Sequence, residues 1–341
     1  MTGSRWSPRR RRRLSRTMVA VVCLVLVAYW LLPRGSSRST RAPQSGSPVA
    51  SSSSNAAASV RVVVQSIGVL PTATSRPAVT VDTDNTVLVL GGLIGGTPGR
   101  STDTVLRIAP ATGAVADAGT LAQASHDAAA ASTPQGVFVF GGGAATTIDA
   151  VQRYAPTGTT VVGHLPRPRS DVVAVTINGT AFVLGGFDGT TTQADVLATT
   201  DGSTFHVVTA LPVPIRYPAM VAIGTTIYLL GGQSGGHSVD TIQAIDVQTG
   251  TAKVIGHLST PISDAMAFVI RGSVFLAGGL DGTTPRQQIS HIDLTTGTST
   301  PAGTLPTPLA DSGVAIINDT AYLIGGETPT RTDSILAVKP S

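Results

Sequence analysis

A glycine doublet recurs six times at nearly equal spacing, and it constrains the fold of this chain more than any other feature. Each doublet ends a short apolar run, as in VLVLGG and AYLIGG. The first glycines of the doublets are Gly91, Gly141, Gly185, Gly231, Gly278 and Gly325. The steps between them are 50, 44, 46, 47 and 47 residues. Self-similarity at such a period is typical of solenoids, propellers and arrays, so one structural unit is repeated along the chain.

Each repeat unit has the pattern of four antiparallel strands. In the third unit, apolar runs at 172–177 and 181–184 flank Asn178-Gly179, which is a strong hairpin signal. Two weaker strand patterns follow at 194–200 and 205–211. The first two strands are apolar on both faces, which indicates that each sheet packs between two neighbours. The sequence therefore predicts an all-β fold, a six-bladed β-propeller of four-stranded antiparallel blades.

Units of about 47 residues whose second strand ends in Gly-Gly resemble kelch repeats, and the resemblance covers residues 60–341. The chain departs from the kelch pattern in its aromatic residues, because kelch units usually carry a Tyr and a Trp in the third and fourth strands. Tyr154 alone occupies the Tyr position, and residues 60–341 contain no Trp. The resemblance implies a kelch-like propeller over residues 59–341 and no particular kelch activity. We expect residues 60–67 to pair with 334–339 and complete the last blade, which would remove an open edge.

The N-terminal part of the chain has the pattern of a membrane anchor. Residues 18–32 are uncharged and apolar, which suits either a short anchor or the core of a cleaved signal peptide. Tyr29-Trp30 at the far end of the run favours the anchor, and so does the lack of a nearby small-x-small cleavage site. We expect an Arg-rich cytoplasmic tail over 1–16, a transmembrane helix over 17–33 and a disordered Ser/Pro/Ala-rich stalk over 34–58. The positive-inside rule then makes this a single-pass protein of the cell membrane, with the propeller outside the cytoplasm.

Charge and composition exclude several classes of function. Residues 1–59 hold ten Arg and no acid, whereas residues 60–341 hold 13 basic residues and all 19 acids, a formal charge of −6. Nucleic acid is therefore not expected to bind the propeller. The only cysteine is Cys23, which excludes a Cys-rich metal site and the Cys–Tyr crosslink of copper oxidases built on kelch-like propellers. The sequence has no P-loop, nucleophile elbow or dinucleotide fingerprint, so we expect no cofactor, no metal and no assigned catalytic residue.

One repeat position carries the candidate binding residues. The residue just before each first strand is, in order, Arg76, Asp127, Asp171, Tyr217, Asp264 and Asp311. Arg216 precedes Tyr217, and Asp188, Asp281 and Glu327 follow glycine doublets on loops expected at the same face. These residues predict a site for a protein, peptide or glycan around the axis, and the competing interpretation is that each Asp caps its own turn. An alternative function is a sugar-modifying enzyme, similar to an epimerase or mutarotase, that uses carboxylates on this face.

Overall fold

The computed structural model describes residues 60–341. Strands are the only regular elements of this part, and none of its residues forms an α-helix. The tail, transmembrane helix and stalk expected in 1–58 lie outside the described residues. A search of residues 60–341 finds no helix with the length and hydropathy needed to span a membrane.

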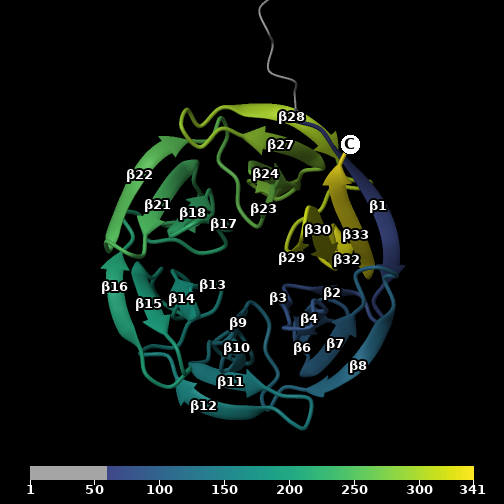
Figure 1. Ribbon diagram of the computed structural model, residues 1–341, viewed down its shortest axis with the longest axis vertical. Coiled ribbons are helices and arrows are strands. Elements are labelled where there is room, and N and C mark those ends of the chain that lie inside the picture. The colour runs from purple at the N-terminus through teal and green to yellow at the C-terminus, as the bar shows by residue number, and fades with distance from the viewer. Residues whose placement is uncertain (1–59) are drawn as a thin grey trace, which may run out of the picture. The chain divides into compact units, whose positions relative to one another are not determined.

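Six four-stranded antiparallel sheets stand around a central axis in residues 60–341, which gives this part of the chain a propeller-like ring (Figure 1). The first three sheets, each given from its first to its fourth strand, are β3 (Ala78–Val81), β4 (Val87–Leu90), β7 (Thr104–Ile108) and β8 (Val115–Thr120); β9 (Ala129–Thr133), β10 (Gly136–Phe140), β11 (Ala150–Tyr154) and β12 (Thr160–His164); β13 (Val173–Ile177), β14 (Thr180–Leu184), β15 (Asp195–Thr199) and β16 (His206–Ala210). The other three are β17 (Ala219–Ile223), β18 (Thr226–Leu230), β21 (Thr241–Asp246) and β22 (Thr251–His257); β23 (Met266–Ile270), β24 (Ser273–Ala277), β27 (Gln288–Ile292) and β28 (Ser299–Thr304); β29 (Gly313–Ile317), β30 (Thr320–Ile324), β33 (Ser334–Pro340) and β1 (Val62–Val69). In every sheet the first strand lies nearest the axis and the fourth lies outermost (Figure 1).

β1, the first strand of residues 60–341, completes the sixth sheet. β1 pairs antiparallel with β33, from Val62 opposite Pro340 to Val69 opposite Ser334. The sequence predicts pairing of 60–67 with 334–339; the two segments do pair, but the first strand begins and ends two residues later than expected. The pairing joins the two ends of the described chain in one sheet, so the sixth sheet has no missing fourth strand.

The core of the described residues consists of six apolar clusters, and each cluster lies between two neighbouring sheets. One cluster joins the first two sheets through Leu88, Leu90 and Val139, and another joins the sixth sheet to the first through Ile324 and Val89. All four residues of β4 are buried, because one face of that strand packs on the second sheet and the other on the sixth. This explains why the inner strands are apolar on both faces instead of alternating.

The glycine doublets sit where the backbone turns sharply beside the next sheet. Gly185 has φ +63°, a left-handed conformation that favours glycine. A Cβ on Gly185 would lie 2.4 Å from the carbonyl oxygen of Ile215. Glycine is therefore favoured at this position for two reasons: the backbone has a positive φ, and the neighbouring repeat approaches too closely for a side chain.

Four small antiparallel units lie beyond the doublets. They are the three-stranded unit β2 (Thr74–Ser75), β5 (Leu93–Ile94) and β6 (Arg100–Ser101), and the pairs β19 (Gln233–Ser234) with β20 (His237–Ser238), β25 (Leu280–Asp281) with β26 (Thr284–Pro285), and β31 (Glu327–Thr328) with β32 (Thr330–Arg331). Six residues come just before a first strand and were predicted as site residues. The residue that precedes each of them forms an antiparallel β-bridge with the residue after a doublet, as between Ser170 and Phe187 or Arg216 and Gln233. The loops entering first strands and leaving second strands therefore lie side by side.

Candidate functional site

The six residues that precede the first strands form a closed ring of backbone hydrogen bonds. The amide of each donates to the carbonyl oxygen of the preceding one, and the amide of the first donates to the last, with distances of 2.8–3.2 Å. All six have positive φ, between 52° and 61°. We call them the ring residues: Arg76, Asp127, Asp171, Tyr217, Asp264 and Asp311. Their recurrence in the sequence thus reflects a position at which the six repeats meet at one end of the axis.

The left-handed conformation explains part of the sequence at this position. Asp tolerates positive φ better than most residues, which accounts for its presence at four of the six ring positions. Arg76 and Tyr217 have φ 54° and 52° without that tolerance, and a bulky residue in this region is strained. Backbone geometry therefore accounts for the four Asp, and the Arg and Tyr need another explanation.

Two arginines bind three of the four ring carboxylates. The guanidinium of Arg76 contacts Asp127 at 3.4 Å and Asp311 at 3.3 Å, and Arg216 contacts Asp171 at 3.1 Å. Arg216 also lies over the rings of Phe187 and Tyr217, at 4.7 and 4.6 Å from their centres. The arginine contacts are therefore unevenly distributed among the four carboxylates, and Arg76 and Tyr217 occupy opposite positions of the ring.

Asp264 is the ring carboxylate without an arginine contact. It is 8% exposed, and its carboxyl interacts with Ser263 and with the neighbouring carboxyl of Asp311. Its Oδ2 nevertheless has no hydrogen-bond partner within the described residues. A buried carboxylate oxygen without a partner carries a high free-energy cost unless the group is protonated or a ligand binds it. The arrangement leaves one buried position in the ring that a cationic group would satisfy.

Burial raises the pKa of all four ring carboxyls. The pKa of Asp127 is raised to about 7, chiefly by burial, with the charges of Asp171 and Asp264 adding to the effect and that of Arg76 opposing it. The pKa of Asp311 lies well above its ordinary value because of burial and the neighbouring Asp264 charge. Burial likewise raises the pKa of Asp171 and of Asp264. The ring thus holds protons more tightly than exposed carboxyls do.

The other predicted site residues lie around the ring or outside it. Glu327 accepts a hydrogen bond from Ser75 at 2.7 Å and pairs with Arg331 at 3.8 Å, and its charge acts on Arg76. Asp188 accepts hydrogen bonds from the amides of Thr190 and Thr191 in its own loop, and Asp281 pairs with Arg286. Turn chemistry therefore describes Asp188, and Asp281 is paired within its own loop.

His126 is a residue of the site that the sequence analysis did not select. Its Nδ1 lies 2.8 Å from the hydroxyl of Ser101, and its Nε2 lies 3.7 Å from Asp127. Burial and the charge of Arg76 lower the pKa of His126. The sequence did contain a signal for His126. It directly precedes Asp127, as the predicted site residue Arg216 directly precedes Tyr217. Across residues 60–341 no group of three or more His, Cys, Asp or Glu side chains is placed to hold a metal ion.

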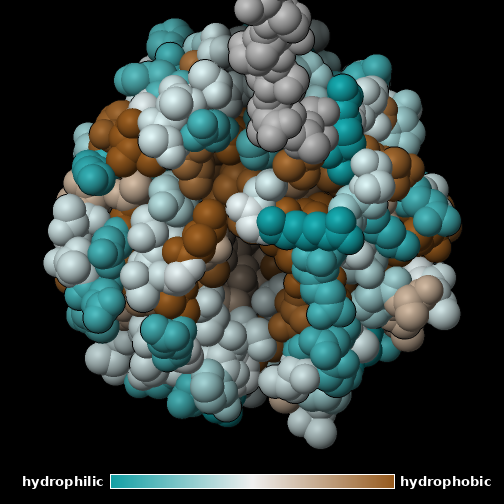
Figure 2. Space-filling model, turned by 45° about the horizontal axis from the view of Figure 1, so that its top comes forward, coloured by the Kyte–Doolittle hydropathy of each residue, from teal (hydrophilic) through white to brown (hydrophobic). Residues whose placement is uncertain are grey.

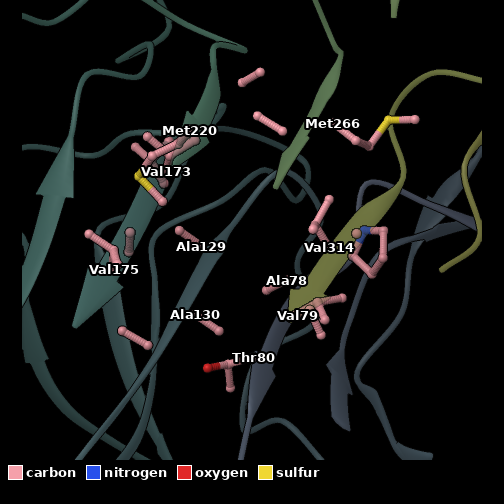
Figure 3. Close-up of a pocket in the computed structure, with 18 of the residues that line it drawn as sticks. Ala78, Val79, Thr80, Ala129, Ala130, Val173, Val175, Met220, Met266 and Val314 are labelled. Carbon is pink, nitrogen blue, oxygen red and sulfur yellow. The ribbon is translucent and has the colours of Figure 1, made fainter. Parts of the chain in front are cut away.

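A channel runs along the axis from the ring residues between the six first strands. Its volume is about 690 Å³, and its walls consist mainly of Ala, Val and Met side chains. Hydrophobic residues surround the hollow at the centre of the body in Figure 2. Figure 3 shows Ala129, Val173, Met220 and Val314 among the side chains that line it. The charged ring and the apolar channel form one continuous cavity.

Comparison with known proteins agrees with the architecture. A family model described as the kelch motif matches residues 214–251. The chain carries a kelch repeat. The solved structure of YjhT is similar, with a TM-score of 0.68 and 15% identity over 80% of this chain and 96% of YjhT. At this identity the likeness concerns the fold alone. The comparison with curated proteins gives no match.

Proposed function

We propose that the propeller-like body of this kelch-repeat chain is a binding module whose ring end takes a cationic group, such as a Lys or Arg side chain of a protein or peptide. The observation that carries the proposal is the buried Oδ2 of Asp264, which has no partner. Four carboxylates stand against two guanidiniums at the ring, so a bound cation would reduce the remaining excess of negative charge. The strained φ of Tyr217 also supports a functional role, since such strain clusters at ligand sites.

The alternative is a sugar-modifying activity of the epimerase or mutarotase type. The observation in its favour is Asp127, whose pKa of about 7 suits a general acid or base near neutral pH. Against it, the charge of Arg76 is shared between Asp127 and Asp311, and Asp171 is bound by Arg216. Carboxylates held by ion pairs are less free to transfer protons, so we favour binding over catalysis.

Matched Asn substitutions test the proposal. Calorimetric titration with a Lys-containing peptide is expected to show binding to the parent protein and at least tenfold weaker binding to Asp264→Asn. Asp171→Asn is the control, because it removes a carboxylate that Arg216 already binds. Equal affinities in all three proteins, or binding of an acidic peptide with the same affinity, would contradict a cation site at Asp264. Faster anomer exchange of reducing sugars, measured by NMR and lost in Asp127→Asn, would favour the enzyme instead.

We also propose that the six sheets form a complete six-bladed propeller and that the chain tethers it to the outer face of the cell membrane. The pairing of β1 with β33 and the cyclic set of six core clusters support the blade number. The Arg-rich block before the apolar run at 18–32 supports the tether and its orientation. A reporter fused after Ser341 that is active only in the cytoplasm would contradict the orientation. A soluble product beginning near residue 34 would identify a cleaved signal peptide.

A further inference from the structure

The axial channel is an elongated cavity. Each first strand contributes four or five residues, so the walls extend about 17 Å along the axis at about 3.3 Å per residue. A volume of about 690 Å³ over that length has room for an extended chain, and it lies within the range of small-molecule sites. The labelled side chains of Figure 3 come from all six first strands or the residues beside them.

Polarity changes along the channel. At one end lie the ring carboxylates, and along the walls lie apolar side chains such as Ala130, Val175 and Met266. Toward the ends of the first strands apolar residues become exposed, with Ile223 at 41% and Ile316 at 39%. A ligand that matches this gradient has a polar head at the ring and an aliphatic tail along the strands.

The chemistry of the ring specifies the charge of the head. Asp264 lines the cavity, is more than nine-tenths buried and has an Oδ2 without a hydrogen-bond partner. The two nearest guanidiniums, those of Arg76 and Arg216, bind other ring carboxylates. A primary ammonium supplies both the missing charge and hydrogen-bond donors, whereas a carboxylate head would be repelled. The described residues form no metal-binding group, which disfavours a bare divalent cation at this place.

We propose that the axial channel binds an unbranched alkyl chain bearing a primary ammonium group, with the ammonium at Asp264 and the chain along the apolar walls. This proposal rests on the cation site at Asp264 proposed above and adds a specific ligand class and a second surface, the channel wall. Apolar contact with the chain removes alkyl surface from water, and the ammonium hydrogen-bonds a buried carboxylate.

A chain-length series tests the channel directly. Calorimetric titration of the full chain with n-butyl-, n-hexyl-, n-octyl- and n-decylammonium, below their micelle concentrations, is expected to show tighter binding with length. Complete burial of one methylene corresponds to about a fourfold gain in affinity, so a gain of about two- to fourfold per methylene is expected until the channel is filled. The n-alkanoates of equal length are expected to bind at least tenfold more weakly. Affinity that is independent of chain length, or equal for amines and alkanoates, would overturn the proposal.

Substitutions in the channel separate this site from the ring. Val175→Phe and Thr80→Phe both narrow the channel, and each is expected to weaken octylammonium binding at least tenfold while leaving the affinity for a Lys-containing peptide unchanged. Val207→Phe is the matched control, because Val207 lies exposed on the outer strand β16. Unchanged octylammonium binding in both channel variants, with their folding verified by circular dichroism, would overturn the channel site. If the Lys-containing peptide binds but alkylammonium affinity does not depend on chain length, the proposed function stands and the channel site is rejected. If alkylammonium affinity rises with chain length but the peptide does not bind, only the peptide function is rejected.

Discussion

The guanidinium of Arg76 lies 5.7 Å from the centre of the Tyr217 ring, although the two residues precede the first and the fourth sheets. The two residues therefore lie opposite each other among the six ring residues, and their side chains approach each other near the axis. Arg216 approaches the same aromatic ring at 4.6 Å, so Tyr217 has two cations near its face. Cation–π attraction of this kind contributes about 0.5–2 kcal/mol per pair and offsets part of the cost of positive φ at Tyr217. The two ring residues that are not Asp thus stabilise each other across the site.

Replacing Arg76 by Met is expected to lower the free energy of unfolding by about 3 kcal/mol, because it leaves the buried carboxylates of Asp127 and Asp311 without their cation. Urea denaturation at pH 7 measures the change. Arg153→Met is the control, since Arg153 is exposed on β11 and is expected to change stability by less than about 0.5 kcal/mol. Equal stability of the two variants would mean that the ring carboxyls do not depend on Arg76.

The raised pKa of Asp127 makes stability depend on pH. A carboxyl whose pKa is about 7 in the folded state, against an ordinary value of 3.8, binds its proton more tightly when the protein is folded. The folded state therefore holds more protons between about pH 4 and pH 7, and the free energy of unfolding falls as the pH rises through this window. Asp127→Asn keeps a side chain that tolerates positive φ and removes this titration, so its stability is expected to fall less steeply.

Denaturation midpoints between pH 4.5 and 8 measure that slope. Asp117→Asn is a suitable control, because Asp117 lies exposed on the outer strand β8. The remaining ring carboxyls, whose pKa values are also raised, are expected to keep part of the slope in Asp127→Asn. Identical slopes in the parent protein and Asp127→Asn would show that Asp127 does not titrate in this range.

Much of the fold could be predicted from the sequence because its signals are local and repeated. Asn178-Gly179 between apolar runs indicates a hairpin. Six doublets at nearly equal spacing indicate that the same backbone geometry recurs in every repeat. The pairing of β1 with β33 was expected because it removes an open strand edge from the last blade. Each inference needed only the order of residues along the chain.

The charge distribution of the site could not be predicted in the same way. The recurrence of Asp indicated the ring positions, but it did not indicate where each side chain points from a backbone of positive φ. Arg76 reaches both neighbouring carboxylates, and Asp264 has no arginine contact and an Oδ2 without a hydrogen bond, although all occupy equivalent repeat positions. Asp188 illustrates the reverse case, since its place after a doublet suggested a site residue and its own loop amides bind it. Which carboxylate is paired depends on side-chain packing between repeats, which periodicity does not record.

The closure of the sixth sheet predicts opposite outcomes for two adjacent valines of β1. Val62 is 6% exposed and packs in the core cluster between the fifth and sixth sheets, whereas Val63 is 52% exposed. Val62→Asp would bury a carboxylate and is expected to reduce stability by at least about 3 kcal/mol. Val63→Asp, the matched control, is expected to change it by less than about 1 kcal/mol. Thermal unfolding followed by circular dichroism distinguishes them, and equal melting temperatures would contradict the closure by β1.

Positive φ and close approach of a neighbouring repeat are two reasons for glycine in this fold, and two glycines with nearly the same φ allow them to be tested separately. Gly185 has φ +63° and Gly282 has φ +59°, so alanine is strained by about 1–2 kcal/mol at either position. A Cβ at Gly185 would also lie 2.4 Å from the carbonyl oxygen of Ile215, and a Cβ at Gly282 would meet no atom within 4 Å. That carbonyl accepts the hydrogen bond from the amide of Gly186, so it has little freedom to move away.

Gly185→Ala is therefore expected to destabilise the protein by at least about 2 kcal/mol more than Gly282→Ala, since relieving the clash disturbs the contact between the third and fourth repeats. Urea denaturation of the two variants gives the difference between their free energies of unfolding. The cost of positive φ cancels in this difference because the two glycines have nearly the same φ. A difference near zero would mean that φ alone selects glycine at the doublets. In that case the recurrence of the doublets would reflect a local turn and not the approach of one repeat to the next.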